Sequence, residues 1–226
     1  MTQELSQSGA SPRPARGNAS FAAIILAAGA STRMGTPKAL LDAGGGESFL
    51  DRLAGTFLDA GCSVYAVLGA QADAIEQASH RRGAVTFVRN PDPSRGQLSS
   101  LQCGLRAIVP GVDAVFFTPV DAPCIARETI LELKDLLEGM DFAIPIYEGK
   151  RGHPVLMRSA CAEQFLALSD GASARDLLHS RRAATRFVEV ADAAILDDID
   201  DQEAYGQWRT AALGVPRANS SGAQSK

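Results

Sequence analysis

The feature that most limits how this chain can fold is an apolar run that ends in small residues. Residues 21–26 form a run with the length and the sharp ends of a buried β-strand. Small side chains follow from Ala27 to Ser31, so the backbone there can approach a ligand closely and direct its N–H groups towards an anion. Arg33 and Lys38 come next. The stretch predicts a strand and then a loop that binds a polyphosphate through amides, a guanidinium group and an ammonium group.

An ordinary glycine turn between a strand and a helix, with two solvated cations at its rim, is the alternative interpretation of this loop. The loop matches neither the phosphate loop G-x-x-x-x-G-K-[ST] nor the dinucleotide fingerprint G-x-G-x-x-G. Because neither standard signature is present, the assignment depends on what the rest of the chain places beside the loop.

Strand and helix patterns alternate along the remaining chain. Short apolar runs typical of buried strands lie at 64–68, 85–88, 113–120 and 142–147. Between them, apolar residues recur at helical spacing near 49–58, 71–79, 98–108 and 128–137. This alternation predicts an α/β fold of three layers, with a doubly wound, mostly parallel sheet of the Rossmann-like type.

Length and composition indicate one globular domain. The 226 residues are 46% hydrophobic and 21% charged, and a chain of this length can bury a sizeable core. We expect the domain at 21–213, between a polar, disordered leader at 1–20 and a polar, disordered tail at 214–226.

Net charge, apolar runs and cysteine spacing also limit the partners and the cellular location of the protein. The formal net charge of -4 provides no general attraction for nucleic acid, and no apolar run approaches the roughly 18 residues of a membrane helix. The start of the chain lacks the apolar core of a secretory signal, and the cysteines form no C-x-x-C pair. We therefore expect a cytoplasmic protein with no membrane or nucleic-acid partner.

An acidic residue follows the strand predicted at 113–120. Asp121 stands at its carboxyl end, and ligands of open α/β sheets bind beyond the carboxyl ends of the strands. One or two carboxylates, together with substrate phosphates, are the usual ligands of Mg²⁺. Asp121 is thus a candidate magnesium ligand in the same crevice as the first loop. The alternative is that it caps the helix that begins near Ala126.

The segment 90–100, NPDPSRGQLSS, is predicted to be a loop that leads into a helix, because its prolines and glycine exclude regular structure. Two interpretations of it stay open: an ordinary connector in which Ser99 or Ser100 caps the helix start, or a loop whose backbone groups hydrogen-bond the edge of a base.

Several of these segments resemble one family. The first loop, L-A-A-G-x-S-x-R-M-G-x-x-K, resembles the opening signature of the nucleotidyltransferases that act on molybdopterin and sugar phosphates. Ala27, Ala28 and Gly29 are similar to the molybdenum cofactor cytidylyltransferase branch, whereas the guanylyl branch favours Ala-Gly-Gly. The segments beginning at Asn90, at Val120 and at Gly149 also resemble elements of this family, and so do those at 169–178 and 195–205.

The resemblance implies a set of functional residues. Arg33, Lys38 and Asp121 would be catalytic, His153 and Arg175 would contact the acceptor, and Mg²⁺ would bind to Asp121 and Asp200. The nucleotide would be bound by Leu26, Ala27, Ala28, Gly29, Arg33, Lys38, Gly96, Ser99, Ser100 and Asp121.

Simpler roles stay open for three of these positions. His153 can be a structural histidine in a Gly-His-Pro turn, Arg175 a surface arginine on a helix, and Asp200 part of an acidic loop that faces water.

The resemblance also implies a reaction, the transfer of CMP from CTP to the terminal phosphate of molybdenum-bound molybdopterin, with release of pyrophosphate. No general base is required, because a phosphate monoester is largely ionised at neutral pH. One alternative is another NTP, such as GTP, with a sugar or polyol phosphate as acceptor. Another is a non-catalytic protein that binds the finished dinucleotide and delivers it to an apo-molybdoenzyme. The presence of Arg33, Lys38 and Asp121 favours catalysis, because a protein that only delivers the dinucleotide does not need to bind pyrophosphate.

Overall fold

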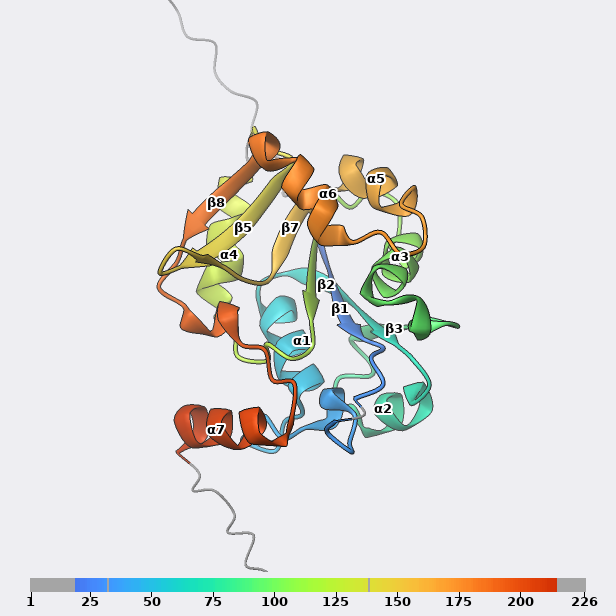
Figure 1. Cartoon of the computed structure of the whole chain (residues 1–226), viewed down its shortest axis with the longest axis vertical. Coiled ribbons are helices and arrows are strands. Elements are labelled where there is room, and N and C mark those ends of the chain that lie inside the picture. Colours follow the sequence, from blue (N-terminus) through green and yellow to red (C-terminus); the bar gives the residue numbers. More distant parts are fainter. Residues whose placement is uncertain (1–18, 32, 138, 215–226) are drawn as a thin grey trace, which may run out of the picture.

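The computed structural model describes residues 19–31, 33–137 and 139–214 (Figure 1). Within these residues, the strands are β1 Phe21–Ala27, β2 Cys62–Leu68, β3 Val85–Arg89, β4 Ala114–Pro119, β5 Phe142–Tyr147, β6 Lys150–Arg151, β7 Val155–Arg158 and β8 Thr185–Glu189. The α-helices are α1 Phe49–Asp59, α2 Ala72–Ala78, α3 Gln97–Ala107, α4 Arg127–Leu136, α5 Ala162–Leu166, α6 Ala174–Ser180 and α7 Gln202–Leu213. None of these helices is long and apolar enough to cross a membrane.

The predicted leader and tail fall mostly outside the described residues, at 1–18 and 215–226. Ser20, which the sequence assigns to the leader, is described. Its backbone N–H donates a hydrogen bond to Oδ2 of Asp113 at 2.7 Å, and its carbonyl accepts one from the Asp113 N–H at 2.9 Å. Ser20, directly before β1, is therefore hydrogen-bonded to the residue directly before β4.

All the strands belong to one mostly parallel sheet, as the alternation of elements predicts. The strand order is β3-β2-β1-β4-β7-β5-β6, and β8 pairs with β5. β1 is parallel to β2 and to β4, and β2 is parallel to β3. β7 runs antiparallel to β4 and to β5, so β5 and its parallel neighbour β8 point the same way as β4. The carboxyl ends of β1 and β4 consequently meet at one edge of the sheet.

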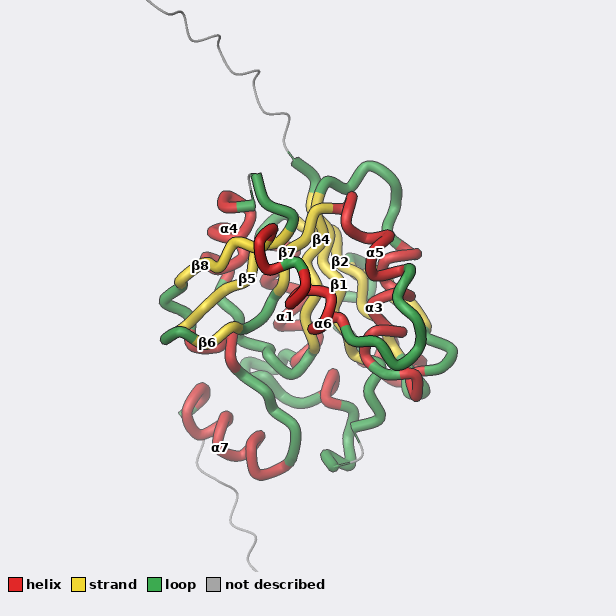
Figure 2. The backbone as a smooth tube through the Cα atoms, turned by 45° about the horizontal axis from the view of Figure 1, so that its top comes forward, coloured by secondary structure: helices red, strands yellow, loops and turns green. Residues whose placement is uncertain are grey.

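Two apolar clusters cover the two faces of the sheet. The helices that contribute to them form the outer layers, and Figure 2 draws these helices in red and the strands of the sheet in yellow. Side chains alternate between faces along a strand, and in β1 Ile25 belongs to one cluster while Ile24 belongs to the other. One cluster includes buried side chains of α1 and α4, and the other includes those of α3 and α5. The expected three-layer α/β architecture is confirmed.

The sequence patterns miss three strands. β6 has only two residues and β7 has four, so neither contains enough alternation to be recognised. β8 reads TRFVE, and its two fully buried side chains, Thr185 and Val188, are separated by partly exposed ones. Pairing with β5 makes this segment a strand, which a local pattern cannot reveal.

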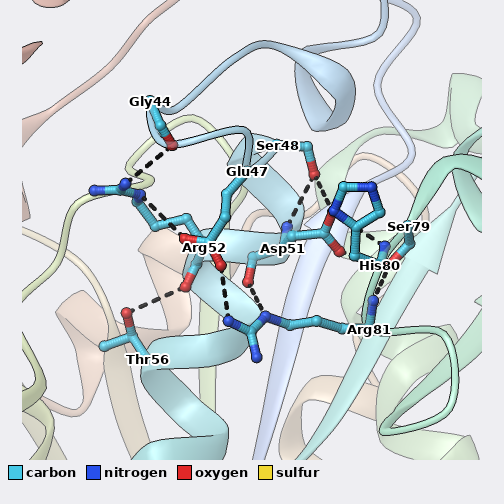
Figure 3. Close-up of polar contacts among 9 residues, drawn as sticks. All are labelled: Gly44, Glu47, Ser48, Asp51, Arg52, Thr56, Ser79, His80 and Arg81. Carbon is cyan, nitrogen blue, oxygen red and sulfur yellow. Dashed lines mark hydrogen bonds and ion pairs between the residues drawn. The ribbon is translucent and has the colours of Figure 1, made fainter.

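The start of α1 is fixed by a buried carboxylate, that of Asp51, which is 1% exposed (Figure 3). The carboxylate accepts hydrogen bonds from Oγ of Ser79 at 2.6 Å, from Oγ of Ser48 at 2.9 Å and from the His80 N–H at 3.3 Å. Ser48 in turn caps α1 by accepting from the Asp51 N–H at 3.1 Å. Arg81 donates from Nε to the Asp51 carbonyl at 2.7 Å. These contacts tie α1 to the turn after α2.

We predict that Asp51→Ala lowers the free energy of unfolding by about 2–4 kcal/mol, because a buried hydroxyl and a backbone N–H lose their acceptor. Chemical denaturation measures this loss. The control is Asp73→Ala, which removes an exposed ion pair with Arg89 and should cost less than about 1 kcal/mol. Equal losses for the two variants would contradict the role given to Asp51.

Candidate functional site

A cavity of about 350 Å³ lies where β1 and β4 end and the first loop leaves the sheet. All the residues that the sequence assigns to the nucleotide site, except Ser99, line this cavity. Asp200, expected to bind the metal, lines it as well. The structure thus brings together residues that are separated by more than a hundred positions in the chain.

The first loop turns back on itself at Ser31. This residue has a left-handed backbone conformation, with φ of 49°, which residues with a side chain rarely adopt. Its hydroxyl accepts a hydrogen bond from the Lys38 N–H at 3.1 Å, and its carbonyl accepts one from the Met34 N–H at 2.9 Å. The Met34 side chain is buried and anchors the turn. Arg33 and Lys38 are held at the cavity as a result.

Lys38 connects the first loop with two carboxylates. Its Nζ lies 3.0 Å from Oδ2 of Asp121 and 2.5 Å from Oδ1 of Asp200. The Lys38 and Asp121 side chains are only 15% and 16% exposed, whereas Asp200 is 42% exposed. Arg33, which is more exposed, reaches the other oxygen of Asp200 at 3.2 Å. Both predicted cations and both predicted acids therefore form one network.

The network shifts the pKa values of Lys38 and Asp200. Partial burial alone would lower the pKa of Lys38, but its hydrogen bonds and charge contacts with Asp200 and Asp121 outweigh that effect and leave the pKa raised. The hydrogen bond from Lys38 lowers the pKa of Asp200. These directions keep the ammonium and this carboxylate charged at neutral pH.

A third acid completes a group suited to a divalent cation. Asp121, Asp198 and Asp200 each offer a carboxylate oxygen, and these oxygens all lie within 4.8 Å of one another. Carboxylate oxygens are the hard ligands that Mg²⁺ and Mn²⁺ accept. The backbone N–H of Ile199 donates to the Asp121 carbonyl at 3.4 Å, and its buried side chain holds the acidic segment against the end of β4. The residues present fit a divalent metal ion.

The loop before α3 forms another wall of the cavity. Gly96 has φ of 88°, a conformation that favours glycine, and lines the cavity together with Ser100. Ser99 does not line it, because its hydroxyl turns back and donates to the Gly96 carbonyl at 2.7 Å. Asn90, which the sequence analysis did not single out, is buried beneath this wall and contacts both serine hydroxyls. Its position at the start of the segment 90–100 is the sequence signal that could have pointed to it.

A second, larger cavity of about 620 Å³ adjoins the first. The two share Leu26, Gly96, Gln97 and Pro119. Much of the second cavity is lined by apolar side chains from α3, α6 and the strands β4, β5, β7 and β8. The expected acceptor residues His153 and Arg175 line it too, together with Arg151.

Five cationic or ionisable side chains line the second cavity: Arg95, Arg151, His153, Arg175 and His179. Arg95 forms an ion pair with Asp170. Neither Arg151 nor Arg175 forms an ion pair with another described residue. The guanidinium of Arg151 lies over the ring of Phe187, 4.6 Å from its centroid. Burial lowers the pKa of His153 to about 4, so its imidazole is neutral at pH 7. Arg151 and Arg175 therefore supply positive charge that no described carboxylate offsets, and His153 supplies hydrogen bonding without charge.

The turn that carries His153 is fixed to the acidic segment. The His153 N–H donates to the Ile195 carbonyl at 2.9 Å. A Cβ on the preceding residue, Gly152, would lie 2.3 Å from that carbonyl oxygen, so only glycine fits there. Because Asp198 and Asp200 follow Ile195 closely, the walls of the two cavities are joined at this contact.

We predict that Gly152→Ala destabilises the protein by about 1–3 kcal/mol, because the added methyl group forces the two segments apart. The measurement is the free energy of unfolding in urea. Gly206→Ala in α7 is the control, since its Cβ meets nothing within 4 Å and alanine favours a helix, so this variant should be as stable as the unmodified protein or more stable. A Gly152→Ala protein of unchanged stability would refute the close contact.

Comparison with known proteins gives a consistent family. A model of the MobA-like NTP transferase domain matches residues 23–185. Molybdenum cofactor cytidylyltransferase of Escherichia coli is 29% identical over 183 residues, which are 80% of this chain and 92% of the relative. Molybdenum cofactor guanylyltransferase of Sinorhizobium fredii is 32% identical over 134 residues, which are 59% of this chain and 60% of the relative.

Solved structures share the fold of this chain. The crystal structure of Rv0371c from Mycobacterium tuberculosis superposes with a TM-score of 0.73 at 25% identity, covering 85% of this chain and 98% of that protein. A crystal structure of the same mycobacterial protein in complex with manganese superposes with a TM-score of 0.70 at 24% identity, covering 84% and 97%.

Proposed function

The chain belongs to the MobA-like NTP transferase family, and from this premise we propose that it transfers CMP from CTP to the terminal phosphate of molybdenum-bound molybdopterin. The products are molybdopterin cytosine dinucleotide and pyrophosphate. The observation that carries the proposal is the pair of adjoining cavities, one with cations facing acids and the other largely apolar with two unpaired arginines.

CTP is favoured over GTP by two observations. The similarity to the cytidylyltransferase extends over 80% of this chain, whereas that to the guanylyltransferase extends over 59%. The first loop carries Ala27-Ala28-Gly29, as in the cytidylyl branch that it resembles. These residues line the first cavity, so they are in contact range of a bound nucleotide.

The first cavity provides what the triphosphate needs. Lys38, Arg33 and the amides of the first loop bind the phosphates, and Lys38 and Arg33 oppose the charge that develops as pyrophosphate leaves. Asp121 and Asp200 would hold Mg²⁺, with Asp198 beside them. Bound there, the ion would neutralise charge on the phosphate oxygens.

The acceptor phosphate attacks from the side of the second cavity. One of its oxygens forms a bond to the α-phosphorus of CTP, and the bond from that phosphorus to the oxygen bridging to the β-phosphorus breaks. The leaving pyrophosphate takes the electron pair. No group of the protein needs to remove a proton, because the attacking phosphate is already ionised at neutral pH. Arg175 attracts this phosphate, and neutral His153 offers a hydrogen bond.

The lining of the second cavity favours molybdopterin over a sugar or polyol phosphate. A sugar has hydroxyl groups on every side, and burying them without partners is costly. Here most of the wall is apolar, with Phe117, Ile144 and Phe187 among the lining side chains. Such a wall suits the fused ring system of a pterin better, because that ring system carries fewer hydroxyl groups than a sugar.

We predict that the protein releases pyrophosphate when mixed with Mg²⁺, CTP and molybdenum-bound molybdopterin. The rate with GTP or ATP should be at least about tenfold lower, because one or two hydrogen bonds to the base are lost. Glucose 1-phosphate in place of molybdopterin should give no release. Tight binding of the finished dinucleotide without any pyrophosphate release would instead indicate a carrier protein.

Asp121→Ala should lower the rate of this reaction at least about a hundredfold while the protein stays folded, since it removes a metal ligand that acts in the transition state. The control is Asp73→Ala, which removes a carboxylate from the exposed surface and should leave the rate unchanged. Undiminished Mg²⁺-dependent activity of the Asp121 variant would remove the metal assignment.

A further inference from the structure

Asn90 is a buried polar residue beneath the first cavity that the reaction described above does not use. Its exposure is 6%, and it lies between the end of β3 and the loop that leads to α3. Its backbone N–H donates to the Leu68 carbonyl at the end of β2, at a distance of 2.8 Å. The side chain is thus anchored to the sheet, and its amide points into the base of the loop.

The direction of the Asn90 amide is set by one neighbour. The backbone N–H of Asp92 lies 3.0 Å from Oδ1 of Asn90. An N–H group can only donate, so the atom facing it must be the amide oxygen. The amide nitrogen therefore faces the opposite way, towards Oγ of Ser99 and Oγ of Ser100, each at 2.9 Å. Both of its protons are donated to these two hydroxyl oxygens.

This arrangement leaves one hydroxyl proton without a partner. Oγ of Ser99 accepts from Asn90 and gives its own proton to the Gly96 carbonyl at 2.7 Å. Oγ of Ser100 also accepts from Asn90, but among the described residues it donates to no acceptor. Ser100 lines the first cavity. Its O–H is consequently a donor available to whatever occupies that cavity.

We propose that Asn90 is a positioning residue for nucleotide selection, which fixes Ser100 as a hydrogen-bond donor to the base of the bound nucleotide. The inference rests on the proposed function, because it takes a nucleoside triphosphate as the ligand. The Watson–Crick edge of cytosine presents two adjacent acceptors, N3 and O2. The corresponding atoms of guanine, N1 and N2, carry protons. A donor of fixed direction at Ser100 therefore favours cytosine.

Asn90→Asp tests the proposal because it keeps the shape of the side chain and reverses its hydrogen bonding. A carboxylate only accepts, so the Ser100 hydroxyl turns its proton towards residue 90 and presents lone pairs to the cavity. We expect the affinity for Mg²⁺-CTP, measured by isothermal titration calorimetry, to fall about tenfold or more. Affinity for Mg²⁺-tripolyphosphate, which has no base, should not change.

A double-mutant cycle shows whether Asn90 acts through Ser100. Ser100→Ala alone should weaken CTP binding, and adding Asn90→Asp in the S100A background should cause no further loss. Gln71→Glu, at an exposed position outside both cavities, controls for the added negative charge and should bind CTP normally. Equal losses from Asn90→Asp with and without the Ser100 hydroxyl would overturn the proposal.

A second variant covers the case in which a buried charge at position 90 prevents folding. Asn90→Ala removes the donor without adding charge, so the Ser100 hydroxyl becomes free to rotate. We expect about a threefold loss of CTP affinity, which again disappears in the S100A background. Unchanged CTP affinity of this variant would reject the role given to Asn90 but would leave the proposed function standing. Failure of the unmodified protein to bind Mg²⁺-CTP would reject the proposed function before any variant is made.

Discussion

The contact of one ammonium group with two carboxylates joins the parts of the candidate site. Lys38 belongs to the first loop, Asp121 follows β4, and Asp200 precedes α7. Attraction between opposite charges is stronger in a partly buried position than in open water, so this contact holds a cationic loop against an acidic wall. A triphosphate with a divalent ion has the complementary pattern, with phosphates for the loop and the ion for the acids.

The sheet makes this contact possible, because β1 and β4 are parallel neighbours and end at the same edge. The acidic segment reaches that edge through Ile199, whose N–H donates to the Asp121 carbonyl. The same segment meets the turn of the second cavity where the Ile195 carbonyl accepts from His153. The segment 195–200 therefore contacts a wall of each cavity, an arrangement that would fix the position of a nucleotide in one relative to an acceptor in the other.

Periodicity in the sequence is enough to predict the first five strands and the helices between them, because most of these elements contain several buried apolar residues. The first loop and Asp121 are predictable too, since each directly follows a buried strand. β7 and β8 are not, because pairing with distant strands rather than local pattern makes them strands. The role of Asn90 depends on hydrogen bonds to Ser99 and Ser100, nine and ten residues away, which no spacing rule reveals.

Anomalous diffraction from crystals grown with Mn²⁺ and CTP would locate both the metal ion and the triphosphate. We predict a manganese peak within coordination distance of Asp121 and Asp200, with the triphosphate between that ion and the side chains of Arg33 and Lys38. A peak bound to other residues, or a triphosphate outside the first cavity, would contradict this prediction.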